Sequence, residues 1–133
     1  MIAVNYVEPQ LDFIQLQQVV REARIHNDVI VDAYGPEEHA RGWYYDLEDQ
    51  LQFPFQARCI AANIVSPLSR GETVEILHMA PEGSCSADML VLIRGQGRKL
   101  AVPLSQLAAI DVDQTTADAM GDWHYWVAQR YLF

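Results

Sequence analysis

Basic residues are scarce in this sequence. Nine lysines and arginines stand against eighteen aspartates and glutamates, which gives a formal net charge of −9 at pH 7. Phosphate backbones and anionic membrane surfaces repel a protein of this charge. The composition therefore predicts neither a nucleic-acid partner nor a membrane partner, and it favours cations or a basic protein.

Long hydrophobic runs are also lacking, and no stretch is long and apolar enough to cross a bilayer. The first residues, 1–8, lack the basic start and the apolar run of a signal peptide, which predicts a cytoplasmic protein. Only two cysteines are present, Cys59 and Cys85. Two are too few for a disulfide scaffold, and a cytosol keeps them reduced.

Familiar catalytic motifs are missing too. There is no nucleophile elbow, no glycine-rich phosphate loop followed by lysine, and no His-Glu-x-x-His. Cys59, Cys85, His78 and His124 do not show the short paired spacing of zinc sites. The sequence predicts a non-catalytic protein. A thiol enzyme built on one of the cysteines would need a thiol pKa well below the reference value of about 8.5.

The 133 residues are half apolar, which is enough for one core and predicts a single domain, residues 1–133. Residues 1–52 are predicted to be the helical part. Asp12 and Gln15 resemble a capping box for an amphipathic helix up to Arg24, and 29–31 is a short β-prone piece. Pro36 suits the first position of a second helix that runs to about residue 51.

Residues 56–110 change to the alternating and continuous apolar patterns of strands. Residues 95–97 carry the glycines of a tight hairpin, and Pro103 starts a single turn before the chain returns to Ile110. A last helix over 113–130 is capped by Asp113 or Thr115. These patterns predict an α+β fold, with a small SH3-like β-barrel packed with N-terminal helices and a C-terminal helix.

Seven acidic residues fall within one stretch that has a single basic residue: Asp28, Asp32, Glu37, Glu38, Asp46, Glu48 and Asp49. Asp46 and Asp49 lie three residues apart on the second helix and share a face, beside Gly42. A hard divalent cation would relieve their repulsion, and calcium accepts oxygen ligands in irregular geometry. The alternative is an ordinary solvated helix face.

An EF-hand is not predicted. Residues 111–122 place acids at the first ligand positions, but Thr116 stands where the loop needs glycine and Asp122 replaces the bidentate glutamate. Capping of the last helix explains the same residues. The polar loop 81–88 offers Glu82 to an ion, although such loops are more often plain turns.

Aromatic residues are dense at Trp123, Tyr125 and Trp126 and again over 43–45. Most of them should fill the gap between the helices and the barrel, because aromatic side chains bury the most area. An exposed remainder predicts a different function: an SH3-like interaction module whose groove holds a basic or proline-rich peptide.

Four blocks of the sequence resemble a known family. In chain order they are 42–55 (GWYYDLEDQLQFPF), 79–82 (MAPE), 97–104 (GRKLAVPL) and 122–127 (DWHYWV). Together they resemble the CcbP-like family of small calcium-binding proteins, first associated with heterocyst differentiation in cyanobacteria. The resemblance covers roughly residues 28–133.

The resemblance implies a calcium binder without an EF-hand and without catalysis, acting as a cytosolic buffer or regulator of free calcium. Matching of the motifs gives six candidate calcium ligands, of which the last three are the weaker: Asp46, Glu48, Asp49, Glu82, Asp32 and Glu38. The loop after Pro81 is usually more acidic in the family, whereas Gly83 and Ser84 follow Glu82 here. This departure predicts weaker calcium binding.

Overall fold

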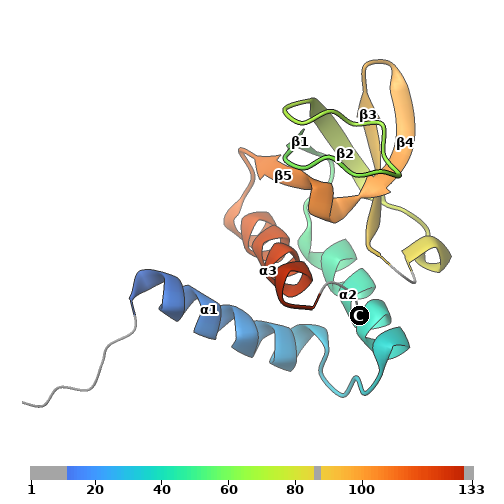
Figure 1. The fold of residues 1–133 in the computed structure, drawn as a ribbon. Helices are drawn as coiled ribbons and strands as arrows, with labels where there is room; N and C mark the ends of the chain where they lie inside the picture. Colours follow the sequence, from blue (N-terminus) through green and yellow to red (C-terminus); the bar gives the residue numbers. More distant parts are fainter. Residues whose placement is uncertain (1–11, 86–87, 131–133) are drawn as a thin grey trace, which may run out of the picture.

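The computed structural model describes residues 12–85 and 88–130, and Figure 1 shows its helices lying to one side of a β-sheet. The helical part consists of α1 (Phe13–Arg24), a π-helical turn η2 (Ile25–Val29) and α2 (Pro36–Gln50). Asp12 and Gln15 form the predicted capping box at the start of α1. Pro36 begins α2 as predicted, because its missing N–H is not needed in the first turn.

The strands form one antiparallel sheet: β1 (Phe55–Cys59), β2 (Thr73–Met79), β3 (Leu90–Gly95), β4 (Arg98–Pro103) and β5 (Leu107–Ile110). Their order is β4-β3-β2-β1-β5. Within the described residues β4 and β5 are the two edges, so the sheet is open. The fold is α+β, as predicted, while closure into a barrel is not seen.

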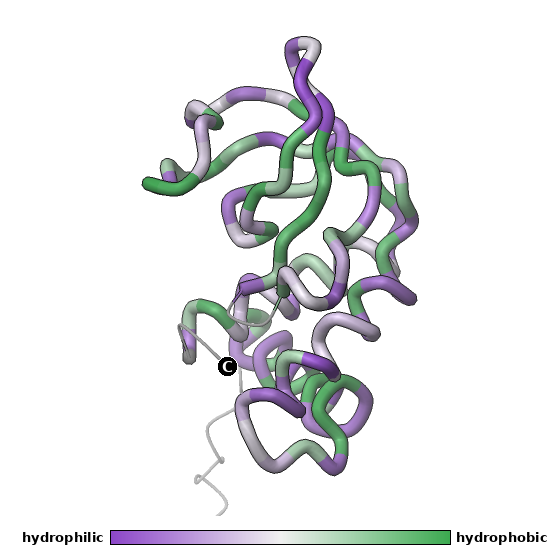
Figure 2. The backbone as a smooth tube through the Cα atoms, turned by 90° about the vertical axis from the view of Figure 1, so that its right-hand side faces the viewer, coloured by the Kyte–Doolittle hydropathy of each residue, from purple (hydrophilic) through white to green (hydrophobic). Residues whose placement is uncertain are grey.

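Two connections follow the turn signals of the sequence. Gln96 and Gly97 both have positive φ, at 53° and 75°, which suits the tight hairpin between β3 and β4. Figure 2 shows the hydrophilic tip of this hairpin beyond the hydrophobic stretches of the sheet. After Pro103, the 3-10 turn η4 (Leu104–Gln106) brings β5 back to pair with β1.

The last helix, α3 (Gln114–Arg130), begins directly after Asp113 and packs with α2 beneath the sheet. The core lies between these helices and the inner face of the sheet, where Trp43, Leu47, Ile76 and Trp123 are fully or almost fully buried. A short 3-10 helix, η3 (Glu82–Cys85), lies between β2 and β3. No helix among the described residues is long and apolar enough to cross a membrane.

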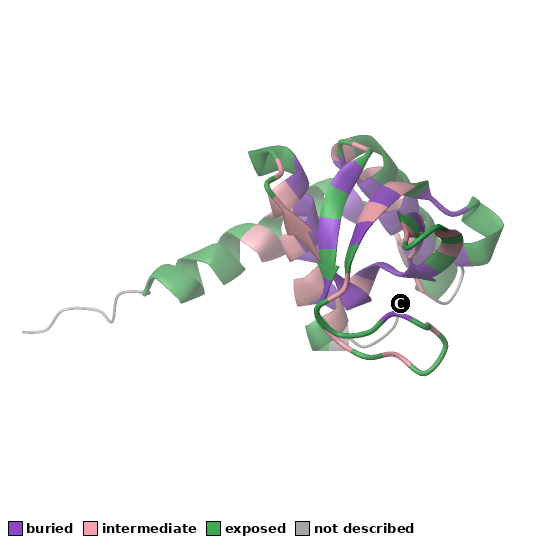
Figure 3. Cartoon of the chain, turned by 90° about the horizontal axis from the view of Figure 1, so that it is seen from above, coloured by how far each residue is buried: buried purple, intermediate pink, exposed green. Residues whose placement is uncertain are grey.

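One local prediction is wrong. The β-prone piece 29–31 is not a strand, because Val29 ends the π-helical turn and packs with Ile30 into the core. The predicted helix α1 is present, but its apolar side is not covered: Phe13 is 73% exposed and α1 has no buried residue. Figure 3 shows α1 projecting from the body, almost entirely exposed. Helical periodicity predicted the helix correctly, but not a surface to cover it.

Candidate metal centre

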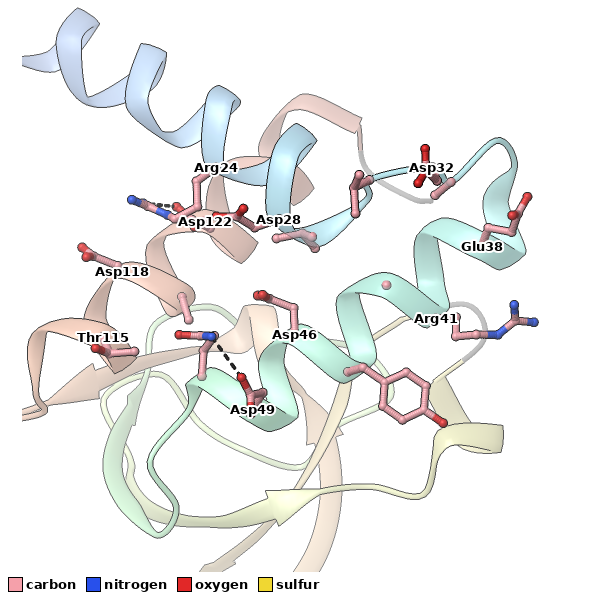
Figure 4. Close-up of a pocket in the computed structure, with 17 residues that line it drawn as sticks. Arg24, Asp28, Asp32, Glu38, Arg41, Asp46, Asp49, Thr115, Asp118 and Asp122 are labelled. Carbon is pink, nitrogen blue, oxygen red and sulfur yellow. Dashed lines mark hydrogen bonds and ion pairs between the residues drawn. The ribbon is translucent and has the colours of Figure 1, made fainter.

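A pocket of about 770 Å³ opens where the end of α1, the turn after η2, α2 and α3 meet (Figure 4). Its lining includes seven carboxylates and two arginines: Asp28, Asp32, Glu38, Asp46, Asp49, Asp118, Asp122, Arg24 and Arg41. Because these acids come from three separate parts of the chain, folding concentrates negative charge that the sequence shows only in part.

Gly42 allows α2 to approach η2 closely. A Cβ atom on Gly42 would lie 2.4 Å from the carbonyl oxygen of Val29, closer than real Cβ contacts. The glycine therefore places the α2 face that carries Asp46 directly against the segment that carries Asp28.

We expect Gly42→Ala to lower the free energy of unfolding by about 1–3 kcal/mol, because the clash is with backbone and cannot be relieved by a side-chain rotation. Alanine would otherwise stabilise a helix interior by about 1 kcal/mol relative to glycine. Urea denaturation of the calcium-free protein measures the change. Gly83→Ala is the control, because a Cβ there meets nothing within 4 Å. A Gly42→Ala protein more stable than wild type would contradict the close approach.

Asp46 carries the clearest electrostatic signature of the pocket. The pKa of Asp46 is raised from 3.8 to about 6, mainly by burial and also by the neighbouring charges of Asp122, Asp28 and Asp49, while Arg24 opposes them. In Figure 4 the Asp46 side chain points from α2 toward the region of Asp28 and Asp122. Such a carboxylate is ionised at neutral pH at a cost in free energy, which a bound cation would relieve.

Asp122 is the most buried acid of the pocket, with a side chain that is 4% exposed. Arg24 donates from Nε to one of its oxygens and from Nη2 to the other, both at 2.7 Å. Arg21 adds an ion pair from Nε at 3.3 Å. Arg24 thus neutralises Asp122 from within the pocket, and burial of this acid is compensated by arginine.

The donor chemistry fits calcium, since every acidic side chain in the lining offers hard oxygen atoms and none of the described residues that line the pocket carries a thiol or an imidazole. The side chains are not already gathered around one point: no group of three His, Cys, Asp or Glu side chains is placed to hold a metal ion within residues 12–85 and 88–130. Binding would therefore require rotations of the exposed carboxylates, for which the open pocket leaves room.

The structure divides the six predicted ligands into two groups. Four of them line the pocket: Asp32, Glu38, Asp46 and Asp49. The other two, Glu48 and Glu82, are not part of its lining. Glu48 lies two residues, about 200°, around the helix from Asp46. Glu82 instead accepts a 2.6 Å hydrogen bond from the hydroxyl of Tyr45.

The third acidic contribution, from α3, was missed. Asp118 and Asp122 line the pocket beside Thr115. The sequence of residues 111–122 was interpreted only as a segment that departs from the EF-hand motif and as the start of a helix. One signal was available, because positions 115, 118 and 122 recur at helical intervals and share a face. Helical periodicity applied to polar residues predicts this shared face of α3. It does not predict that the face lies against α2.

The predicted peptide groove is not open. Trp123 and Trp126 are 2% and 5% exposed, and both pack against Trp43 with ring centroids 5.1 and 5.7 Å apart. Tyr125 is half-buried and donates a hydrogen bond to Glu22 of α1. The aromatic residues fill the space between α2 and α3, because their large apolar area is most effective in the core.

The fold and the pocket define a class, an α+β protein with a carboxylate-lined pocket between helices. Within that class, a family model described as calcium binding, Calci_bind_CcbP, matches residues 23–127. The chain therefore belongs to the CcbP family of calcium-binding proteins, which confirms the resemblance found in the sequence.

Two solved structures are similar to the chain. One, described as a calcium binding protein in the calcium-binding form, is 42% identical with a TM-score of 0.76, over 86% of this chain and 94% of that chain. The other is the crystal structure of Anabaena CcbP, 39% identical with a TM-score of 0.74, over 92% of this chain and 96% of that chain. The comparison with curated proteins gives no match.

Proposed function

We propose that this protein binds calcium in the pocket between α2, α3 and the end of α1, and that it acts as a buffer or regulator of free calcium in the cytosol. The observation that carries the proposal is Asp46, a partly buried acid whose pKa is raised to about 6 by burial and by three neighbouring carboxylates. Membership of a calcium-binding family identifies the cation that suits this environment.

Asp46 and Asp49 on α2 are the central ligands of the proposal. Asp28 and Asp118 line the same pocket from the two neighbouring helical segments, and Asp32 and Glu38 extend the acidic lining toward the start of α2. Calcium tolerates such a mixed set of carboxylates, because it accepts about six to eight oxygens and completes its shell with water. Glu48 and Glu82 lie outside this ligand set. The replacement of acidic residues by Gly83 and Ser84 after Glu82 therefore does not weaken the proposed site.

We propose further that the protein has no catalytic activity. Burial raises the pKa of the Cys85 thiol, which is the opposite of what an activated nucleophile requires. Cys59 is also buried, with its thiol donating to the carbonyl oxygen of Ala61 at 3.3 Å. Neither cysteine supports the alternative of a thiol enzyme.

The sheet also supports a relation to SH3-like barrels. Four strands follow one another as antiparallel neighbours, and β5 crosses over after a 3-10 turn to pair with β1. We propose that the sheet is an open form of such a barrel. A peptide-binding function does not follow from it, because the tryptophans of the predicted groove lie in the core.

A calcium titration followed by NMR tests the proposed function. We expect amide resonances near Asp46 and Asp49 to shift together with those near Asp118, because the pocket joins two helices that are far apart in sequence. Calcium at about 100 times its Kd should also stabilise the fold by about 2.7 kcal/mol through mass action. Magnesium is the control cation, since it retains more of its water. No resonance shift and no calorimetric heat at saturating calcium would refute the proposal.

A further inference from the structure

Arg24 is a cation that belongs to the protein and already lies in the acidic pocket. Its guanidinium uses two donors on the two oxygens of Asp122, at 2.7 Å each, in the planar geometry that arginine shares with carboxylates. Figure 4 shows this pair at the end of α1, with Asp28 labelled beside Asp122 and Asp46 below them. Asp122 is therefore oriented by arginine and not by its acidic neighbours.

The setting of Arg24 differs from that of an ordinary surface ion pair. Asp122 is 4% exposed while the Arg24 side chain is 32% exposed, so the acid is fixed in place and the arginine is the partner able to move. The helix that carries Arg24 has no buried residue. Polar contacts to α3, from Arg21, Arg24 and Glu22, hold this helix against the body.

A calcium ion entering the pocket would meet this arginine. The guanidinium repels the dication directly, and it also occupies the oxygens of the one pocket acid that is almost fully buried. Both effects oppose calcium binding. The Asp122 carboxylate is turned toward α1, and the described residues hold no ready group of three metal-binding side chains.

We infer that Arg24 is an internal counter-ion that competes with calcium for Asp122 and thereby sets the calcium affinity of the pocket. This inference rests on the proposed function. It assigns a residue that lowers the affinity of the acidic pocket, and this residue lies at the very edge of the matched family region, which begins at residue 23. The affinity of this protein is then determined by α1 as well as by the ligands on α2.

Calorimetric calcium titrations of Arg24→Gln and wild type test the inference. We expect the variant to bind calcium about fivefold more tightly, because a unit positive charge near a dication is removed even under water-like screening. Arg41→Gln is the matched control. Arg41 also lines the pocket, but no ion pair of Arg41 is found in the described part of the chain, and its side chain extends away from Asp46 in Figure 4. We expect a gain below about twofold for it.

Arg24→Lys separates the charge from the bidentate geometry, and we expect an affinity between those of wild type and Arg24→Gln. In the wild type, the Nε–Hε resonance of Arg24 should shift on addition of calcium, and this readout does not depend on the stability of any variant. A folded Arg24→Gln protein without a gain in affinity, equal gains for the two glutamine variants, or an unchanged Arg24 resonance would each overturn the inference. Absence of calcium binding in wild type and variants alike would instead overturn the proposed function, and the inference with it.

Discussion

Asp46→Asn is expected to weaken calcium binding by about thirtyfold. A unit charge and a dication about 4 Å apart attract each other by about 2 kcal/mol even at the dielectric constant of water, and the substitution removes this attraction while preserving shape. Asp46 is the acid that burial and three neighbouring carboxylates act on together, so its charge is the one that a cation relieves most. Calorimetric titration measures the loss.

The control for this experiment is Glu48→Gln, which removes the same charge from the same helix two residues later. Glu48 is exposed and outside the lining of the pocket, so we expect the calcium affinity of the Glu48→Gln protein to stay within about twofold of wild type. The pair also decides between the two descriptions of the site, because the sequence motif contains both residues and the pocket only one. Equal losses for the two variants would contradict the pocket and favour a diffuse effect of net charge.

Asp46→Asn should at the same time stabilise the calcium-free protein at pH 7. The folded protein ionises Asp46 against burial and like charges, whereas the unfolded chain does so freely. Removal of the charge removes this penalty, so we expect a higher melting temperature without calcium and a smaller increase when calcium is added. A variant that loses calcium binding only because it is misfolded would show a lower melting temperature instead.

Lowering the pH from 7 to 5 is expected to weaken calcium binding by about tenfold. With a pKa of about 6, Asp46 passes from mostly ionised to mostly protonated over this range, and the proton competes with calcium for the same oxygens. Titrations at several pH values in wild type and Asp46→Asn measure the effect. Only the difference between the two proteins reports Asp46, because other carboxylates contribute to both. Parallel pH profiles would contradict the assignment.

The contribution of Asp46 to the stability of the calcium-free protein should decrease as the pH rises, whereas the contribution of an aspartate with a lowered pKa increases. The folded-state pKa of about 6 lies above the reference value of 3.8, so between these values the folded state holds more protons than the unfolded state. The Asp46 contribution therefore destabilises the fold progressively as the pH rises from about 4 to 6, and it stays constant above that. Thermal melts of wild type and Asp46→Asn should converge toward pH 4.

The sequence by itself determined the helices, most of the strands and the family. These features depend on local physics: a capping box at Asp12, a proline at the start of α2, glycine in the β3–β4 hairpin and alternation of apolar residues in the strands. Local propensity failed at 29–31, where Val29 and Ile30 are buried by packing of the π-helical turn against α2, while Val31 is exposed.

Only the tertiary structure decided which acids act together. Residues 46 and 48 are equivalent in a motif, but helical rotation directs one into the pocket and the other away from it. Asp122 and Arg24 are separated by 98 positions and meet only because the fold brings the end of α1 against α3. Charge acts through space and not along the chain, so the sequence determined that this protein is an acidic member of a calcium-binding family, while the fold alone determined where its charge gathers and which arginine opposes it.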